Sequence, residues 1–235
     1  MEDYKSSNID KYFITNEQSK FSTHPSKIVS IESFRRLCRY LASSDERILD
    51  IGGGAGIWTK IIQEEGIRIE TWALDISSSI LKEREKQDIK IVGDIEHLPF
   101  KNESFDRAFF FSSLHHVKHT HRALEEALRV VKLRGHIIVS EPISLRLLLL
   151  RQDIQPVDSI EFCFSISYIL RLLKKLGLEI NSIYYHGLFR RMMPRKPNVN
   201  IYRICDRFDH VLNNIPLLKH IGILGNKVTI VTQKR

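Results

Sequence analysis

Asp50 and the glycines that follow it are the residues of this sequence best suited to holding a ligand. Gly52, Gly54 and Gly56 come directly after an apolar segment that ends in Asp50. Glycine permits a tight turn and lets a ligand approach the backbone, here just before an expected helix N-terminus. A carboxylate at this point would repel a phosphate group, but it can pair with a cation. The pattern therefore favours a positively charged ligand at this turn.

Two phosphate-binding patterns do not fit the same turn. A dinucleotide-binding G-x-G-x-x-G would need glycine at position 57 or 59, where the sequence has Ile57 and Thr59. The turn also lacks the G-x-x-x-x-G-K-S/T pattern of a P-loop. The glycines alone remain a weak signal that several classes of nucleotide-binding protein share.

Asp75 and Asp94 end the next two apolar segments, so three aspartates stand at three successive strand ends. Each aspartate alone has a more common role as a turn or helix-capping residue. Ligands of open α/β sheets bind at the carboxyl ends of the strands, and the joint placement of the three favours a binding site.

The elements that must position these residues alternate between strand and helix. Strands are expected at 47–51, 69–74, 89–92, 105–111, 136–140, 179–185 and 228–232, and helices at 27–42, 57–65, 77–86, 121–131 and 165–176. Apolar residues between 201 and 212 trace one further amphipathic helix. The rhythm predicts an α/β fold with a mostly parallel sheet and helices on both faces.

With these motifs the sequence resembles the class I S-adenosylmethionine-dependent methyltransferases, in particular their "type 11" small-molecule group. The family pattern is an acid followed by G-x-G-x-G, as at residues 50–56, and further family motifs are matched in order at 72–77, 92–100, 104–117 and 129–136. The last match departs from the family, because Leu133-Arg134-Gly135 replaces the usual Pro-Gly-Gly. The resemblance implies a Rossmann-like sheet of seven strands with a helical insertion before the last strand.

The resemblance also implies S-adenosyl-L-methionine as the cofactor and direct methyl transfer as the reaction. Asp75 would accept from the ribose hydroxyls, since a carboxylate can accept from both hydroxyls of a vicinal diol, and Asp94 would accept from the adenine amino group. The cofactor-binding residues carried over are Asp50, Gly52, Gly54, Gly56, Asp75, Ile76, Asp94, Ile95 and Ser112.

His115 and His116 are the candidates for a general base, because histidine titrates near neutrality and the pair follows a strand end. A structural role for the pair is the alternative, since histidines occur here in the family with different acceptors. His119 and His121 lie close in sequence, but the cluster holds no cysteine or acidic ligand, and no metal site is predicted.

The charge is uneven along the 235 residues. Residues 1–142 carry 21 basic and 22 acidic side chains, whereas residues 143–235 carry 15 and 6. Either an anionic partner or a solvated surface accounts for this excess. Five basic residues without an acid lie between 188 and 203. Segment 143–150 is apolar, and an acceptor pocket, a core helix, a homodimer contact and membrane binding remain open for it.

The expected organisation is an N-terminal extension or lid at 1–26 and a cofactor-binding α/β core at 27–142. Residues 143–235 complete the same domain and include a basic insertion at 187–226. The start of the chain does not have the pattern of a secretion signal, no apolar run is long enough to span a membrane, and the three cysteines form no CxxC pair. We therefore expect a cytoplasmic protein.

Three functions remain open from the sequence. The first is a methyltransferase acting on a small, anionic or lipid-like metabolite. The second is an RNA methyltransferase, which the net charge of +8 supports. The proline-containing motifs of two nucleic-acid methylation chemistries are missing, which disfavours nucleic acid as the acceptor. The third is a non-catalytic binding protein with the same fold.

Overall fold

A computed structural model gives the structure of the chain, in which residues 25–144, 147, 149, 152–156, 162–187, 199–214 and 227–235 are described. The expected extension 1–26 lies outside the described residues except for its last two. Residues 188–198 and 215–226 of the basic insertion lie outside them as well. Within the described part of the chain, no helix has the length and apolar character that crossing a membrane requires.

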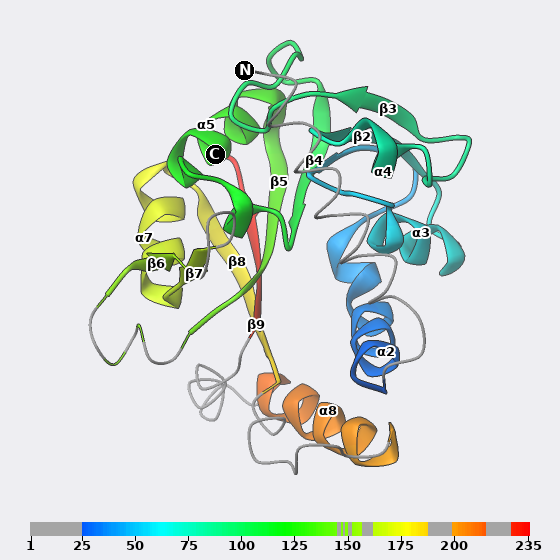
Figure 1. Cartoon of the computed structure of the whole chain (residues 1–235), viewed down its shortest axis with the longest axis vertical. Helices are drawn as coiled ribbons and strands as arrows, with labels where there is room; N and C mark the ends of the chain where they lie inside the picture. Colours follow the sequence, from blue (N-terminus) through cyan, green and yellow to red (C-terminus); the bar gives the residue numbers. More distant parts are fainter. Residues whose placement is uncertain are drawn as a thin grey trace.

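A seven-stranded sheet organises the described residues (Figure 1). Its strands lie in the order β3 (Ile89–Val92), β2 (Ile69–Asp75), β1 (Glu46–Ile51), β4 (Phe105–Phe111), β5 (Val131–Pro142), β9 (Lys227–Gln233) and β8 (Glu179–His186). β9 runs antiparallel to both of its neighbours, and the other adjacent pairs are parallel. The predicted Rossmann-like, mostly parallel α/β fold is confirmed.

Helices cover the two faces of this sheet. In Figure 1, α2 (Pro25–Leu41) and α3 (Ile57–Glu64) lie on one side, and α5 (Thr120–Val130) and α7 (Ile166–Lys175) on the other. The amphipathic pattern at 201–212 forms α8 (Val199–Asn214), the expected helix before the last strand. The sequence pattern missed the small hairpin of β6 (Ile154–Pro156) and β7 (Phe162–Phe164).

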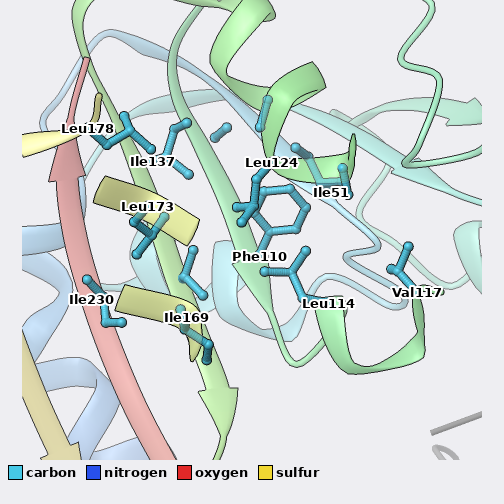
Figure 2. Packing of buried hydrophobic residues seen from close by; sticks show 14 of the residues in the cluster. Ile51, Phe110, Leu114, Val117, Leu124, Ile137, Ile169, Leu173, Leu178 and Ile230 are labelled. Carbon is cyan, nitrogen blue, oxygen red and sulfur yellow. The ribbon is translucent and has the colours of Figure 1, made fainter. Parts of the chain in front are cut away.

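The core forms on both faces of β4 because successive side chains of a strand point to opposite faces. Phe109 and Phe111 pack with residues of α2 and α3, and Phe110 packs with residues of α5 and α7. Figure 2 shows Phe110 among the apolar side chains of the second cluster, beside Leu114 and Leu124. This double burial explains why β4 reads as an almost unbroken apolar run.

Two predicted boundaries are wrong. The helix expected at 77–86 is only α4 (Ser78–Leu81), after which the chain turns so that the Arg84 side chain points inward and is fully buried. The turn expected around Leu133-Arg134-Gly135 instead lies within β5, beside a register shift against β4. A Cβ on Gly135 would come within 2.7 Å of the Asp106 carbonyl oxygen, which explains the glycine.

We expect Phe110→Ala to lower the free energy of unfolding by about 3–5 kcal/mol, because it leaves a cavity in a fully buried cluster. Chemical denaturation measures the loss. Leu133→Ala is the control, since Leu133 is 59% exposed and its truncation should cost no more than about 0.5 kcal/mol. Equal losses in the two variants would contradict the core described above.

Candidate functional site

A cavity of about 460 Å³ opens at the carboxyl ends of β1, β2 and β4. Its volume falls in the range of small-molecule sites, and its place in the sheet is where α/β folds bind ligands. Nine residues predicted for the site line it: Gly52, Gly54, Gly56, Asp75, Ile76, Asp94, Ile95, Ser112 and His116. Asp50 and His115 are not part of this lining.

The glycine turn joins β1 to α3 and forms one wall of the cavity. Gly52 and Gly56 have φ angles of 65° and 78°, which side-chain-bearing residues rarely adopt. Gly53 is required for a different reason, because a Cβ there would lie 2.2 Å from the Asp50 carboxyl carbon. The turn therefore packs directly onto Asp50 and leaves its outer side to a ligand.

Asp50 lies under this turn and is held by Arg84. The Arg84 Nη1 atom donates to Asp50 Oδ2 at 3.0 Å and to the carbonyl oxygens of Gly53 and Gly54 at 3.1 and 3.3 Å. The same guanidinium donates to Thr59 Oγ1 and to Asp88. One buried cation thus ties β1, the turn, α3 and the segment after α4 together.

The pKa values of Asp50 and Arg84 depend on each other. Burial raises the pKa of Asp50, and the charge of Arg84 opposes that rise. Burial alone would lower the pKa of Arg84, but Asp50 and Asp88 more than reverse it, and the pKa is raised. Asp50 Oδ1 has no hydrogen-bond partner among the described residues. Asp50 is therefore tolerated inside the fold because Arg84 stays charged beside it.

Asp75 ends β2 and faces the cavity. Its Oδ2 accepts from the Gly54 backbone N–H at 3.0 Å and its Oδ1 from the Ser77 N–H at 2.9 Å. Burial raises the pKa of Asp75, and the two N–H donors partly offset the rise. These bonds orient the carboxylate and join the ends of β1 and β2.

Asp94 is the most open of the three aspartates. Its side chain is 54% exposed, Oδ1 accepts from the Glu96 N–H at 2.8 Å, and Oδ2 lies 3.3 Å from His97 Nδ1. Ile95 beside it and Ile76 after β2 add apolar surface to the same end of the cavity. This end thus combines apolar side chains with an exposed acceptor carboxylate.

His115 and His116 follow β4 in the short helix η1 (Leu114–His116), and only His116 lines the cavity. His115 Nδ1 lies 2.7 Å from Glu141 Oε2, and the two imidazole rings are 4.0 Å apart. Glu141 is fully buried and its other oxygen accepts from the Ser113 and Leu114 N–H groups. Glu141 therefore fixes both the strand end and the His115 ring.

Two further histidines near this region each pair with a different carboxylate. His119 Nδ1 pairs with Glu96, and His121 with Glu125 on α5. In the part of the chain that the structure describes, no three His, Cys, Asp or Glu side chains gather in a way that could hold a metal ion.

Arg84 and Lys227 are two cations beside the cavity that sequence reasoning missed. Arg84 stands in a run of charged residues at 82–90, which looks like a solvated surface. Lys227 begins β9, and its ammonium lies 3.4 Å from Ser112 Oγ and 5.0 Å from the ring centroid of Trp58. Nothing in the sequence distinguishes Lys227 from the other basic residues of segment 143–235.

We expect Arg84→Met to lower the free energy of unfolding by about 3–5 kcal/mol, because it strands two carboxylates in a buried site. Arg68→Met is the matched control. Its ion pair with Asp45 is largely exposed and is worth about 0–1 kcal/mol.

Denaturant titrations of both variants should be run at pH 8 and pH 5. Burial already raises the pKa of Asp50, and without Arg84 it rises further, so acidification lets the buried carboxyl take up a proton. The loss in Arg84→Met should thus be smaller at pH 5. If Arg84→Met lost no more free energy of unfolding than Arg68→Met, or lost more at pH 5 than at pH 8, this role of Arg84 would be contradicted.

Comparisons with known proteins agree with this geometry. Residues 49–139 match the family model of a methyltransferase domain. A demethylmenaquinone methyltransferase of Renibacterium salmoninarum is 32% identical over 139 residues, covering 56% of this chain and 54% of the relative. A ubiquinone/menaquinone biosynthesis C-methyltransferase, UbiE, of Bartonella quintana is 33% identical over 110 residues, covering 43% and 42%. The chain thus spans about half the length of the curated relatives it matches.

A solved structure matches almost the whole chain. A protein of Pyrococcus horikoshii superposes with a TM-score of 0.66 at 18% identity, covering 96% of this chain and 99% of its own. An identity of 18% supports a shared fold only. The family model covers residues 49–139, which include the glycine turn, Asp75 and Asp94. Residues 49–139 are thus similar in sequence to known methyltransferase domains, and the fold of the chain agrees with that match.

Proposed function

We propose that this protein transfers the methyl group of S-adenosylmethionine to a small, anionic or lipid-like metabolite. The observation that carries the proposal is the cavity at the ends of β1, β2 and β4, with the buried carboxylate of Asp75 facing it beside the glycine turn. The match of residues 49–139 to a methyltransferase domain supports the same function.

The residues of the cavity fit this cofactor. A carboxylate offers about four acceptor positions, and the two backbone donors at Asp75 leave room for both hydroxyls of a ribose. Asp94, more exposed, would accept from the adenine amino group while Ile76 and Ile95 contact the ring. The turn at Gly52, Gly54 and Gly56 would lie against the remainder of the cofactor. Asp50 contributes indirectly, through the shape of that turn.

The bound cofactor supplies a methyl group that its sulfonium already activates, so the main task of the protein is alignment. An acceptor that must lose a proton needs a base in addition. His116 lines the cavity and is the candidate to contact the acceptor. His115, hydrogen-bonded to Glu141, packs against His116 and would position it.

A small acceptor fits the described residues better than RNA does. Arg203 is the one arginine of segment 188–203 within the described chain, and Glu32 of α2 binds its guanidinium at 2.6 Å. That charge is already paired with a carboxylate at the surface. Arg190, Arg191, Arg195 and Lys196 lie outside the described residues.

Asp75→Ala should weaken S-adenosylhomocysteine binding tenfold or more, about 1.4 kcal/mol, because it removes a charge-assisted acceptor. Isothermal titration calorimetry measures the affinity, and thermal unfolding checks that the variant is folded. Asp45→Ala is the control, since Asp45 is exposed and lies outside the cavity lining. Unchanged affinity in folded Asp75→Ala would overturn the assignment of this residue.

Methyl transfer can be tested with methyl-labelled S-adenosylmethionine and a panel of carboxylated and phosphorylated metabolites. With an acceptor that must lose a proton, His116→Ala should lower kcat by about 100-fold or more and change cofactor affinity less than about twofold. His121→Ala, whose ring pairs with Glu125 on α5 and lies outside the cavity lining, should behave as wild type. Equal rates in the two variants would exclude His116 as the base.

A further inference from the structure

Lys227 occupies a place that the proposed cofactor chemistry does not use. It is the first residue of β9, paired with Pro142 at the end of β5 and with His186 at the end of β8. Figure 1 shows β9 (red) running between these two strands. Because β9 is antiparallel to its neighbours, its first residue lies at the same sheet edge as the carboxyl ends of β4 and β5.

The contacts of Lys227 connect it to the cavity. Its Nζ lies 3.4 Å from Ser112 Oγ and 5.0 Å from the centroid of the Trp58 ring. Ser112 and Trp58 both line the cavity, so the ammonium lies next to this lining although Lys227 is not itself part of it. This side of the cavity is distant in the sheet from Asp75 and Asp94, because β1 and β4 separate β2 from β5.

The ammonium is poorly compensated in this position. It carries three N–H donors, and within the described chain its hydrogen-bond partner is the single Ser112 hydroxyl. Burial lowers the pKa of Lys227, and the attraction of Glu141 opposes the effect without an ion pair at salt-bridge distance. A partly buried cation with one neutral partner and one aromatic face costs stability unless an anion joins it.

Glu141 is the nearby carboxylate that could pair with Lys227, but it already has other hydrogen-bond partners. It accepts from two backbone N–H groups and from His115, so its charge is compensated without Lys227. The neighbouring histidine on β8, His186, has a pKa lowered to about 3, with burial as the main cause, and stays neutral near pH 7. In the described part of this edge, Lys227 is thus a cation with no carboxylate at salt-bridge distance.

We propose that Lys227 is the acceptor-recognition residue and holds a carboxylate of the methyl acceptor beside Ser112 and Trp58. One ammonium matches one negative charge, and the Trp58 ring supplies an apolar face for the body of such a molecule. The acceptor class inferred is therefore an apolar or aromatic monocarboxylate. This inference rests on the proposed function, since it assigns the acceptor side of the same site.

The test uses sodium benzoate as the probe and the full chain saturated with S-adenosylhomocysteine. The chain has two tryptophans, and a Trp72→Phe background leaves Trp58 as the sole reporter of fluorescence. Benzoate should change this fluorescence with saturation, and Lys227→Gln should weaken its binding at least tenfold. Calorimetry on the chain with both tryptophans repeats the measurement without the background substitution.

Two variants and one second anion complete the design. Lys174→Gln, at the exposed end of α7, should bind benzoate as wild type does. Lys118→Gln tests the competing lysine of the cavity lining, and a loss there instead of at Lys227 would overturn the proposal. Inorganic phosphate should bind more weakly than benzoate, and tighter binding of phosphate would contradict the carboxylate class.

The outcomes separate this inference from the proposed function. Absent benzoate binding, or equal binding in Lys227→Gln, overturns the role of Lys227 while S-adenosylhomocysteine still binds. A tenfold loss of S-adenosylhomocysteine affinity in Lys227→Gln would also overturn it, because the lysine would then serve the cofactor carboxylate. Failure of S-adenosylhomocysteine to bind the wild type would contradict the proposed function itself.

Discussion

The buried guanidinium of Arg84 is the interaction on which the architecture of the site depends. It binds the carboxylates of Asp50 and Asp88 and the carbonyl oxygens of Gly53 and Gly54. Any of these groups left alone in the interior would carry a large desolvation cost. Because one cation satisfies them together, the turn after β1 holds a single shape, and its outer face is free to meet a ligand.

The division of work among the three aspartates follows from this arrangement. Asp50 is turned inward and stabilises the turn, whereas Asp75 faces the cavity and is aligned by two backbone N–H groups. Asp94 remains largely in solvent at the far end. A family motif that looks uniform in sequence thus contains one structural carboxylate and two that can contact a ligand.

Local pattern was sufficient to predict most of the sheet and the composition of the cavity wall. Strands such as β4 are short apolar runs between polar turns, and the glycine turn has the spacing of a known motif. Nothing local distinguished Arg84 from the exposed charges around it, because its partners lie up to 34 residues away. The helix predicted at 77–86 failed for the same reason, since burial of Arg84 redirects the chain.

The position of Lys227 beside Ser112 could not be predicted from the sequence, because it depends on the strand order of the sheet. Only the antiparallel insertion of β9 between β5 and β8 brings the start of the last strand to Ser112, 115 residues earlier in the chain. On the proposals made above, β1, β2 and the loop after β3 build the cofactor side of the site, and the last strands complete its acceptor side.

Calorimetric titration of the purified protein with S-adenosylmethionine, and separately with NADH, tests the central claim most directly. We expect saturable, micromolar binding of S-adenosylmethionine and no heat of binding with NADH, since the turn has no dinucleotide-binding G-x-G-x-x-G pattern. Absence of S-adenosylmethionine binding by folded protein, or a preference for NADH, would contradict the central claim.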